Sequence, residues 1–224
     1  MNFEKYVQSY CEKNNIELVI SEKTRVNSYS IKCNGFFDAN VPIDFKKEHI
    51  LGIEKYVENN LFLDSRAVLA YSVGEKSEEE ILGLLAHEFA HVNQYIEFSN
   101  LWIDSSKFLI WDEYFKSEKF KLSKVKKVWE QIVKLEVDCE KRVLDLIDKF
   151  NLPINKERYI QKANAYLFFY TYAFLYRKWY NKAPYEVENI VKLMPKTIMD
   201  MDFYVDLENK EIKSKEKHFQ QCFV

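Results

Sequence analysis

Glycine is scarce in this sequence: the chain has 224 residues but only four glycines, at positions 35, 52, 74 and 83. Loops that bind phosphate need several glycines close together, because their backbone amides must approach the phosphate without intervening side chains. The scattered glycines therefore exclude a GxGxxG motif and a P-loop.

Cysteine, net charge and long apolar runs are also limited. The four cysteines, at positions 11, 33, 139 and 222, form no CxxC pair, and the formal net charge is only −2. A nucleic-acid footprint would need a basic face or stripe, so we expect no nucleic-acid partner. The longest apolar stretch, residues 163–176, has 14 residues, whereas a membrane span needs roughly 20, so we expect no membrane partner.

The composition that is present favours a packed globular chain. Hydrophobic residues make up 47% and charged residues 30% of the sequence, which argues against disorder. The first residues, MNFEKYVQSYCEK, lack an apolar core and a cleavage-site pattern, so a secretory signal is not expected. A cytoplasmic protein with free thiols is the expectation that follows.

The N-terminal part mixes predicted strands and helices. Strands are expected at residues 16–20 and 66–73, and an amphipathic helix at 46–60. The pair Asn34-Gly35 predicts a β-hairpin between the segments SYSIKC and FFDANV. A helix of about 20 residues is expected to begin near Ser77, because Glu80 stands three residues later in the spacing of a capping box.

The C-terminal part is predominantly helical, with predicted helices at 123–150 and 156–180. The aromatic segment 101–115 suggests a lid or a cleft wall, and the charged segment 207–224 suggests a peripheral tail. We therefore predict one α+β domain with a small strand-and-helix lobe at about 1–97 and a helical lobe at about 98–206.

The sequence LLAHEFAHVNQ, residues 84–94, carries the main functional signal. His87 and His91 are four residues apart, so on a helix both imidazoles face the same side, and Glu88 can reach a water held there. This is the HExxH pattern, for which zinc is the usual metal. Two ordinary helix histidines are the alternative, but this composition would produce the pattern by chance in roughly 0.008 of such chains.

A catalytic zinc ion normally has three protein ligands, and Glu136 is the best candidate for the third. Glu136 lies in the middle of the apolar stripe of the helix predicted at 123–150, where an unpaired carboxylate would be costly. The alternative is a buried pair of Glu136 with a lysine or a tyrosine. Glu97 is six residues beyond His91 and is rejected, and no pattern supports His49 or His218.

The motifs HEFAH (residues 87–91) and EVDCE (residues 136–140) together resemble the gluzincin-type metallopeptidases, in which HExxH is followed by a helix bearing ExxAD. The resemblance implies a zincin-like fold, zinc bound by His87, His91 and Glu136, and Glu88 as the general base. Two positions depart from the family pattern: Cys139 replaces alanine, and Glu140 replaces the aspartate that orients the first motif histidine. Metallopeptidases of phages and mobile elements of the ImmA/IrrE kind, which act on regulatory proteins inside bacteria, are similar in lacking a signal.

The resemblance implies hydrolysis of peptide bonds in a protein or peptide substrate, by a zinc-activated water from which Glu88 takes the proton. Stabilisation of the oxyanion could come from the helix at 156–180, which carries Tyr159, Tyr166, Tyr170, Tyr172 and Arg177. A zinc-stabilised binding or regulatory protein without turnover is the alternative function.

Two further hypotheses concern substrate and regulation. The predicted strand 66–73 could be the sheet edge to which an extended substrate adds. His218 and Cys222, four residues apart, could cap the metal, although a solvated tail is the simpler interpretation.

Overall fold

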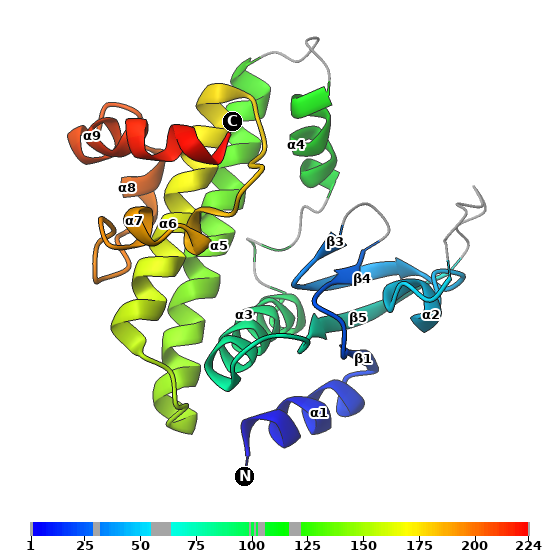
Figure 1. Cartoon of the computed structure of the whole chain (residues 1–224). Helices are drawn as coiled ribbons and strands as arrows, with labels where there is room; N and C mark the ends of the chain where they lie inside the picture. The colour runs from blue at the N-terminus through cyan, green and yellow to red at the C-terminus, as the bar shows by residue number, and fades with distance from the viewer. Residues whose placement is uncertain are drawn as a thin grey trace. The chain divides into compact units, whose positions relative to one another are not determined.

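The computed structural model describes residues 2–28, 32–54, 64–98, 100, 102, 106–116 and 122–223 (Figure 1). Contacts divide the chain into two compact units. The first comprises residues 1–97 and 145–154, and the second comprises residues 98–144 and 155–224. The structure is mixed, with many helices and a small sheet, which confirms the predicted α+β class at the coarse level.

The first unit contains all the strands described. Its elements in chain order are α1 (Phe3–Lys13), β1 (Ile16–Ser21), β2 (Val26–Asn27), β3 (Lys32–Cys33), β4 (Gly35–Pro42), α2 (Lys47–Ile50), β5 (Ser65–Ser72) and α3 (Glu78–Ile96). Strands β1, β5 and β4 form a sheet in that order, with β5 parallel to β1 and antiparallel to β4. The predicted strands at 16–20 and 66–73 are confirmed.

Side chains alternate between the two faces of β5, as the two-residue period of a strand requires. Val68 and Ala70 face one cluster, which also includes Phe45 and Ile50. On α3, Phe89 contacts the rings of Phe3, Tyr6 and Tyr10 from α1, so these two helices pack together. α3 also packs on β4 and β5, and this packing fixes the helix that carries the HExxH pattern.

The predicted hairpin at Asn34-Gly35 is wrong. Cys33 pairs with Val26 of β2, whereas Gly35 pairs with Tyr71 of β5, so β3 and β4 belong to different sheets. The helix predicted at 46–60 is also shorter than expected. α2 ends at Ile50, Gly52 adopts a positive φ of 61°, and residues 55–63 lie outside the described part.

The helix predicted near Ser77 is confirmed. The hydroxyl of Ser77 accepts a hydrogen bond from the backbone amide of Glu80, and the Glu80 carboxylate accepts one from the amide of Ser77. This reciprocal capping box satisfies amides that would otherwise have no partner in the first turn.

The second unit is built from helices. Its elements are α4 (Ser106–Lys116), α5 (Leu122–Phe150) up to residue 144, α6 (Lys156–Tyr176), η1 (Pro184–Glu186), α7 (Glu188–Val191), α8 (Met201–Val205), α9 (Lys210–Phe219) and η2 (Gln220–Cys222). Trp129, near the start of α5, stacks on Phe174, near the end of α6, with ring centroids 4.5 Å apart. The two long helices are therefore antiparallel neighbours (Figure 1).

The apolar stripe predicted on α5 is buried as expected, from Val125 through Val143. α6 is shorter than predicted: it ends at Tyr176 because Arg177 adopts a left-handed conformation with φ of 53°. From the segment 101–115, expected to form a lid or a cleft wall, Trp111 and Tyr114 of α4 pack into the core of this unit.

The segment from residue 207 onward is not peripheral. Ile212, Phe219 and Cys222 are fully or almost fully buried in the core of the second unit. The hydroxyl of Tyr172 on α6 donates a 2.6 Å hydrogen bond to the carbonyl oxygen of Ile212. Although this segment is rich in charged residues, it forms a short amphipathic helix, α9, whose apolar residues belong to the core of the second unit.

Candidate metal centre

α3 carries three of the predicted site residues, His87, Glu88 and His91. The rings of His87 and His91 lie with centroids 4.9 Å apart at an interplanar angle of 87°, which confirms that the two side chains share one face of the helix. The exposed fractions are only 7% for Glu88 and 8% for His91. The motif therefore lies on the packed side of α3 rather than on a solvated face.

Gln94 orients His91. Its Oε1 lies 2.8 Å from Nδ1 of His91, and Gln94 is fully buried. An amide oxygen only accepts hydrogen bonds, so Nδ1 carries the hydrogen and Nε2 keeps its lone pair for a metal ion. Sequence reasoning missed this residue, although a polar side chain three residues beyond His91 was a usable signal.

His91 is held in its neutral form. The pKa of His91 is lowered to about 3, chiefly by burial and in addition by the charge of His87, while the hydrogen bond to Gln94 opposes the shift. An imidazole must be unprotonated to bind a metal ion, so His91 is in its ligating form throughout the physiological pH range.

Glu88 lies close to the backbone of β4. A Cβ atom added to Gly35 would stand 3.1 Å from Cγ of Glu88 and 3.0 Å from the carbonyl oxygen of Ala70. Burial, together with the charge of Glu88, raises the pKa of the neighbouring Cys33 to about 12. Glycine at position 35 therefore serves a close approach between strand and helix, and not the turn that the sequence suggested.

α5 carries Glu136 and Glu140, and the tyrosines of α6 bind both carboxylates. Tyr159 donates a 2.7 Å hydrogen bond to Oε2 of Glu140, and Tyr170 donates a longer one, 3.4 Å, to Oε1 of Glu136. Glu136 is 7% exposed and Glu140 is 4% exposed. A tyrosine contact to Glu136 was one of the predicted alternatives, and the structure contains it.

The candidates for oxyanion stabilisation differ in their hydrogen-bond partners. The hydroxyl oxygens of Tyr170 and Tyr166 lie 3.2 Å apart, and the single hydrogen of Tyr170 can be directed either to Tyr166 or to Glu136. Burial raises the pKa of both hydroxyls well above 10, so both are neutral donors. Arg177 instead donates to the carbonyl oxygen of Tyr114.

The remaining candidates are occupied elsewhere. Nδ1 of His49 accepts from the backbone amide of Lys46, and Cys222 is buried in the core of the second unit. A role for Cys222 as a metal cap would require that core to open.

Four side chains form a group that could hold a metal ion. Ligand atoms of His87, His91, Glu136 and Cys139 all lie within 4.8 Å of one another. Two imidazoles, one carboxylate and one thiol are donors that zinc accepts. By ordinary zinc bond lengths, donor atoms around one tetrahedral ion stand roughly 3.3–3.6 Å apart, so the types of donor in the group are those of a zinc site.

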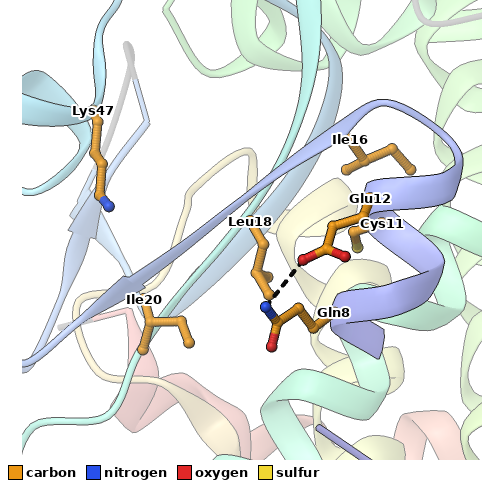
Figure 2. Close-up of a pocket in the computed structure, with 7 residues that line it drawn as sticks. All are labelled: Gln8, Cys11, Glu12, Ile16, Leu18, Ile20 and Lys47. Atoms are coloured by element: carbon orange, nitrogen blue, oxygen red, sulfur yellow. Dashed lines mark hydrogen bonds between the residues drawn. The ribbon is translucent and has the colours of Figure 1, made fainter. Parts of the chain in front are cut away.

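A hollow in the first unit is lined by side chains that do not form a group of metal donors like the one described above. It is lined by residues of α1 and β1 together with Lys47, and the lining residue Gln8 donates a 3.0 Å hydrogen bond to Glu12, which also lines it (Figure 2). Its single thiol, Cys11, has a pKa raised to about 12 by burial. We assign no function to it.

Comparisons with protein-family models, with curated proteins and with solved structures find no match to this chain. Among the described helices, none combines the length and apolar character needed to cross a membrane.

Proposed function

We propose that the protein is a zinc-dependent metallopeptidase with a zincin-like fold, in which His87, His91 and Glu136 hold the metal. The observation that carries the proposal is the group of ligand atoms within 4.8 Å, which includes both histidines of an HExxH pattern. The oriented imidazole of His91 is consistent with it, because a metal-ligating histidine usually donates its other ring N–H to a partner that fixes the tautomer.

Glu88 is the proposed general base. Zinc, when bound, lowers the pKa of water to about 7 and polarises a carbonyl oxygen. Glu88 follows His87 on the same helix and is almost fully buried, so its carboxylate can take a proton from water and deliver it to the leaving amine. A purely structural metal site has no need for such a base.

The substrate would be a protein or peptide in extended form. β5 is the central strand of its sheet, so the hypothesis that the substrate adds to β5 is wrong. β4 pairs only with β5 among the described strands and begins at Gly35, beside Glu88. We therefore assign the substrate to the β4 edge, where backbone hydrogen bonds would hold it near the base.

The second candidate function is a metal-stabilised binding protein without turnover. One observation favours it: Cys139 adds a fourth donor to the group, and structural zinc sites usually have four protein ligands.

Two measurements test the proposal. Elemental analysis of the purified protein should give one zinc per chain, with clear loss in Glu136→Ala and no loss in Asp138→Asn. Asp138 is a suitable control because it lies on the same helix and pairs with Arg142 at 2.7 Å. Zinc fully retained by Glu136→Ala would contradict the ligand assignment.

The Glu88→Gln variant separates the two functions. A peptidase variant should keep its zinc and lose cleavage of a complex peptide mixture, followed by mass spectrometry. A binding protein would show no cleavage in the wild type or in a zinc-loaded Cys139→Ala variant, in which the fourth donor of the group is removed, and no change in metal content or stability in Glu88→Gln.

A further inference from the structure

Cys139 lies on the same face of α5 as Glu136. The two residues are three positions apart, which places their side chains one above the other on a helix. Cys139 is fully buried, as is every neighbouring apolar residue of the stripe. Its thiol therefore faces the packed side of the helix, where the Glu136 carboxylate also lies.

Position distinguishes Cys139 from the other cysteines. Its sulfur belongs to the group of ligand atoms within 4.8 Å, together with the two histidines and Glu136. Cys11 and Cys222 are equally buried, but within the described part of the chain neither belongs to such a group.

We propose that Cys139 is a fourth protein ligand of the metal ion and closes the site in the resting protein. The inference rests on the proposed function and adds regulation to it: the peptidase is latent until the thiolate leaves the metal. A four-ligand zinc site has no position for water, whereas a three-ligand site keeps one open.

The chemistry of the donors supports this arrangement. Thiolate is a softer donor than carboxylate and binds zinc strongly, so it competes well with water for the fourth position. Binding requires the thiolate form, so the Cys139 thiol passes its proton to solvent as the metal binds. Covalent modification of the same sulfur would remove this donor and leave the fourth position open to water.

Cobalt substitution tests the ligand directly. Metal-free protein is loaded with Co²⁺, and the near-ultraviolet spectrum is searched for the charge-transfer band of a thiolate bound to cobalt. We expect the band in the wild type and in Cys11→Ala, a matched control that removes an equally buried thiol. We expect it to be absent in Cys139→Ala and in Cys139→Ser, of which the serine variant preserves side-chain size.

Affinity and activity give independent measurements. Competition with a zinc chelator should show roughly 100-fold weaker binding in Cys139→Ala, the share of one ligand in a four-ligand site. Cleavage of a peptide mixture by the zinc-loaded Cys139→Ala variant should rise above that of the wild type. Far-ultraviolet circular dichroism and thermal unfolding of the metal-free chains verify that each variant is folded.

The outcomes separate this inference from the proposed function. If the wild type binds one cobalt ion without the thiolate charge-transfer band, and the wild type and Cys139→Ala bind zinc equally tightly, Cys139 is not a ligand. The assignment of the other three ligands would be unaffected. Failure of the wild type to bind any metal would overturn both. Loss of metal in His91→Ala together with loss of the band in Cys139→Ala would support both.

Discussion

The side-chain oxygen of Gln94 lies 2.8 Å from Nδ1 of His91, and both residues are buried on α3. The hydrogen bond sets which imidazole nitrogen is available as a ligand. It also couples a residue outside the motif to the proposed metal site, so we expect metal affinity there to depend on more than the donor atoms.

Replacement of Gln94 by alanine should weaken zinc binding by about 10- to 100-fold, because His91 loses the acceptor that fixes its tautomer and ring orientation. Chelator competition measures the change. Asn93→Ala is the control, since Asn93 is a half-buried neighbour on the same helix. Equal affinity in the wild type and Gln94→Ala would show that the imidazole needs no such support.

Replacement of Gly35 by alanine should destabilise the protein by about 1–3 kcal/mol, as overpacking of a core does. The added Cβ would lie 3.0–3.1 Å from atoms of Ala70, Glu88 and Leu84, so α3 or β4 must shift. Urea unfolding measures the stability. Turnover should fall more than zinc affinity, because the displaced side chain is the base and not a ligand; Asn40→Ala, at an exposed position of the same strand, should change neither.

Replacement of Tyr159 by phenylalanine should cost about 1–3 kcal/mol of stability in the metal-free protein. The change removes the donor that lies 2.7 Å from the buried Glu140 carboxylate. A double-mutant cycle with Glu140→Gln isolates the pair: the tyrosine substitution should cost less once the carboxylate is neutral. Additive effects would mean that the two side chains do not interact energetically.

The stability of the metal-free protein should fall in acid partly through His91. Its folded pKa, lowered to about 3 chiefly by burial, lies below the unfolded value near 6.5, so the unfolded chain takes up the proton first. The contribution of His91 to stability is therefore complete above pH 6.5 and is lost as the pH falls toward 3. Its slope is at most about 1.4 kcal/mol per pH unit. His91→Gln should show a flatter stability profile across that window in urea titrations, and parallel profiles would contradict the assignment.

Replacement of Phe219 by alanine should destabilise the second unit by about 3–5 kcal/mol, the usual cost of truncating a buried aromatic side chain. Phe219 is fully buried against Tyr172, with ring centroids 4.5 Å apart. Thermal unfolding measures the loss, and Lys217→Ala on the exposed side of α9 is the control. If Phe219→Ala unfolds at the same temperature as the wild type, the segment from residue 207 onward would be a peripheral tail, as the sequence suggested.

Local signals predicted α3, α5 and β5 well, because each is specified by residues near in sequence. The capping box at Ser77 indicates where α3 begins, and the spacing of apolar residues indicates the extent of α5. The HExxH spacing likewise predicted the shared face of the two histidines without any tertiary information.

The errors came where distant residues decide the outcome. Asn34-Gly35 has the chemistry of a turn, but β5, some thirty residues later, provides the pairing partner of β4. α9 has too few apolar residues to be recognised as core by itself, and only its packing on α6 buries them. Gln94 was overlooked because its role depends on the rotamer of a neighbouring histidine.

α5 has one further consequence, for biosynthesis. Its last residues belong to the first unit, where Phe150 packs against the rings of Phe3 and Tyr6, with ring centroids 5.1 and 4.8 Å apart. The ribosome therefore synthesises this part of the core of the first unit only after α4 and most of α5 have been made. A nascent chain released at residue 97 would lack Phe150, and the N-terminal unit cannot complete its core before that residue has left the exit tunnel.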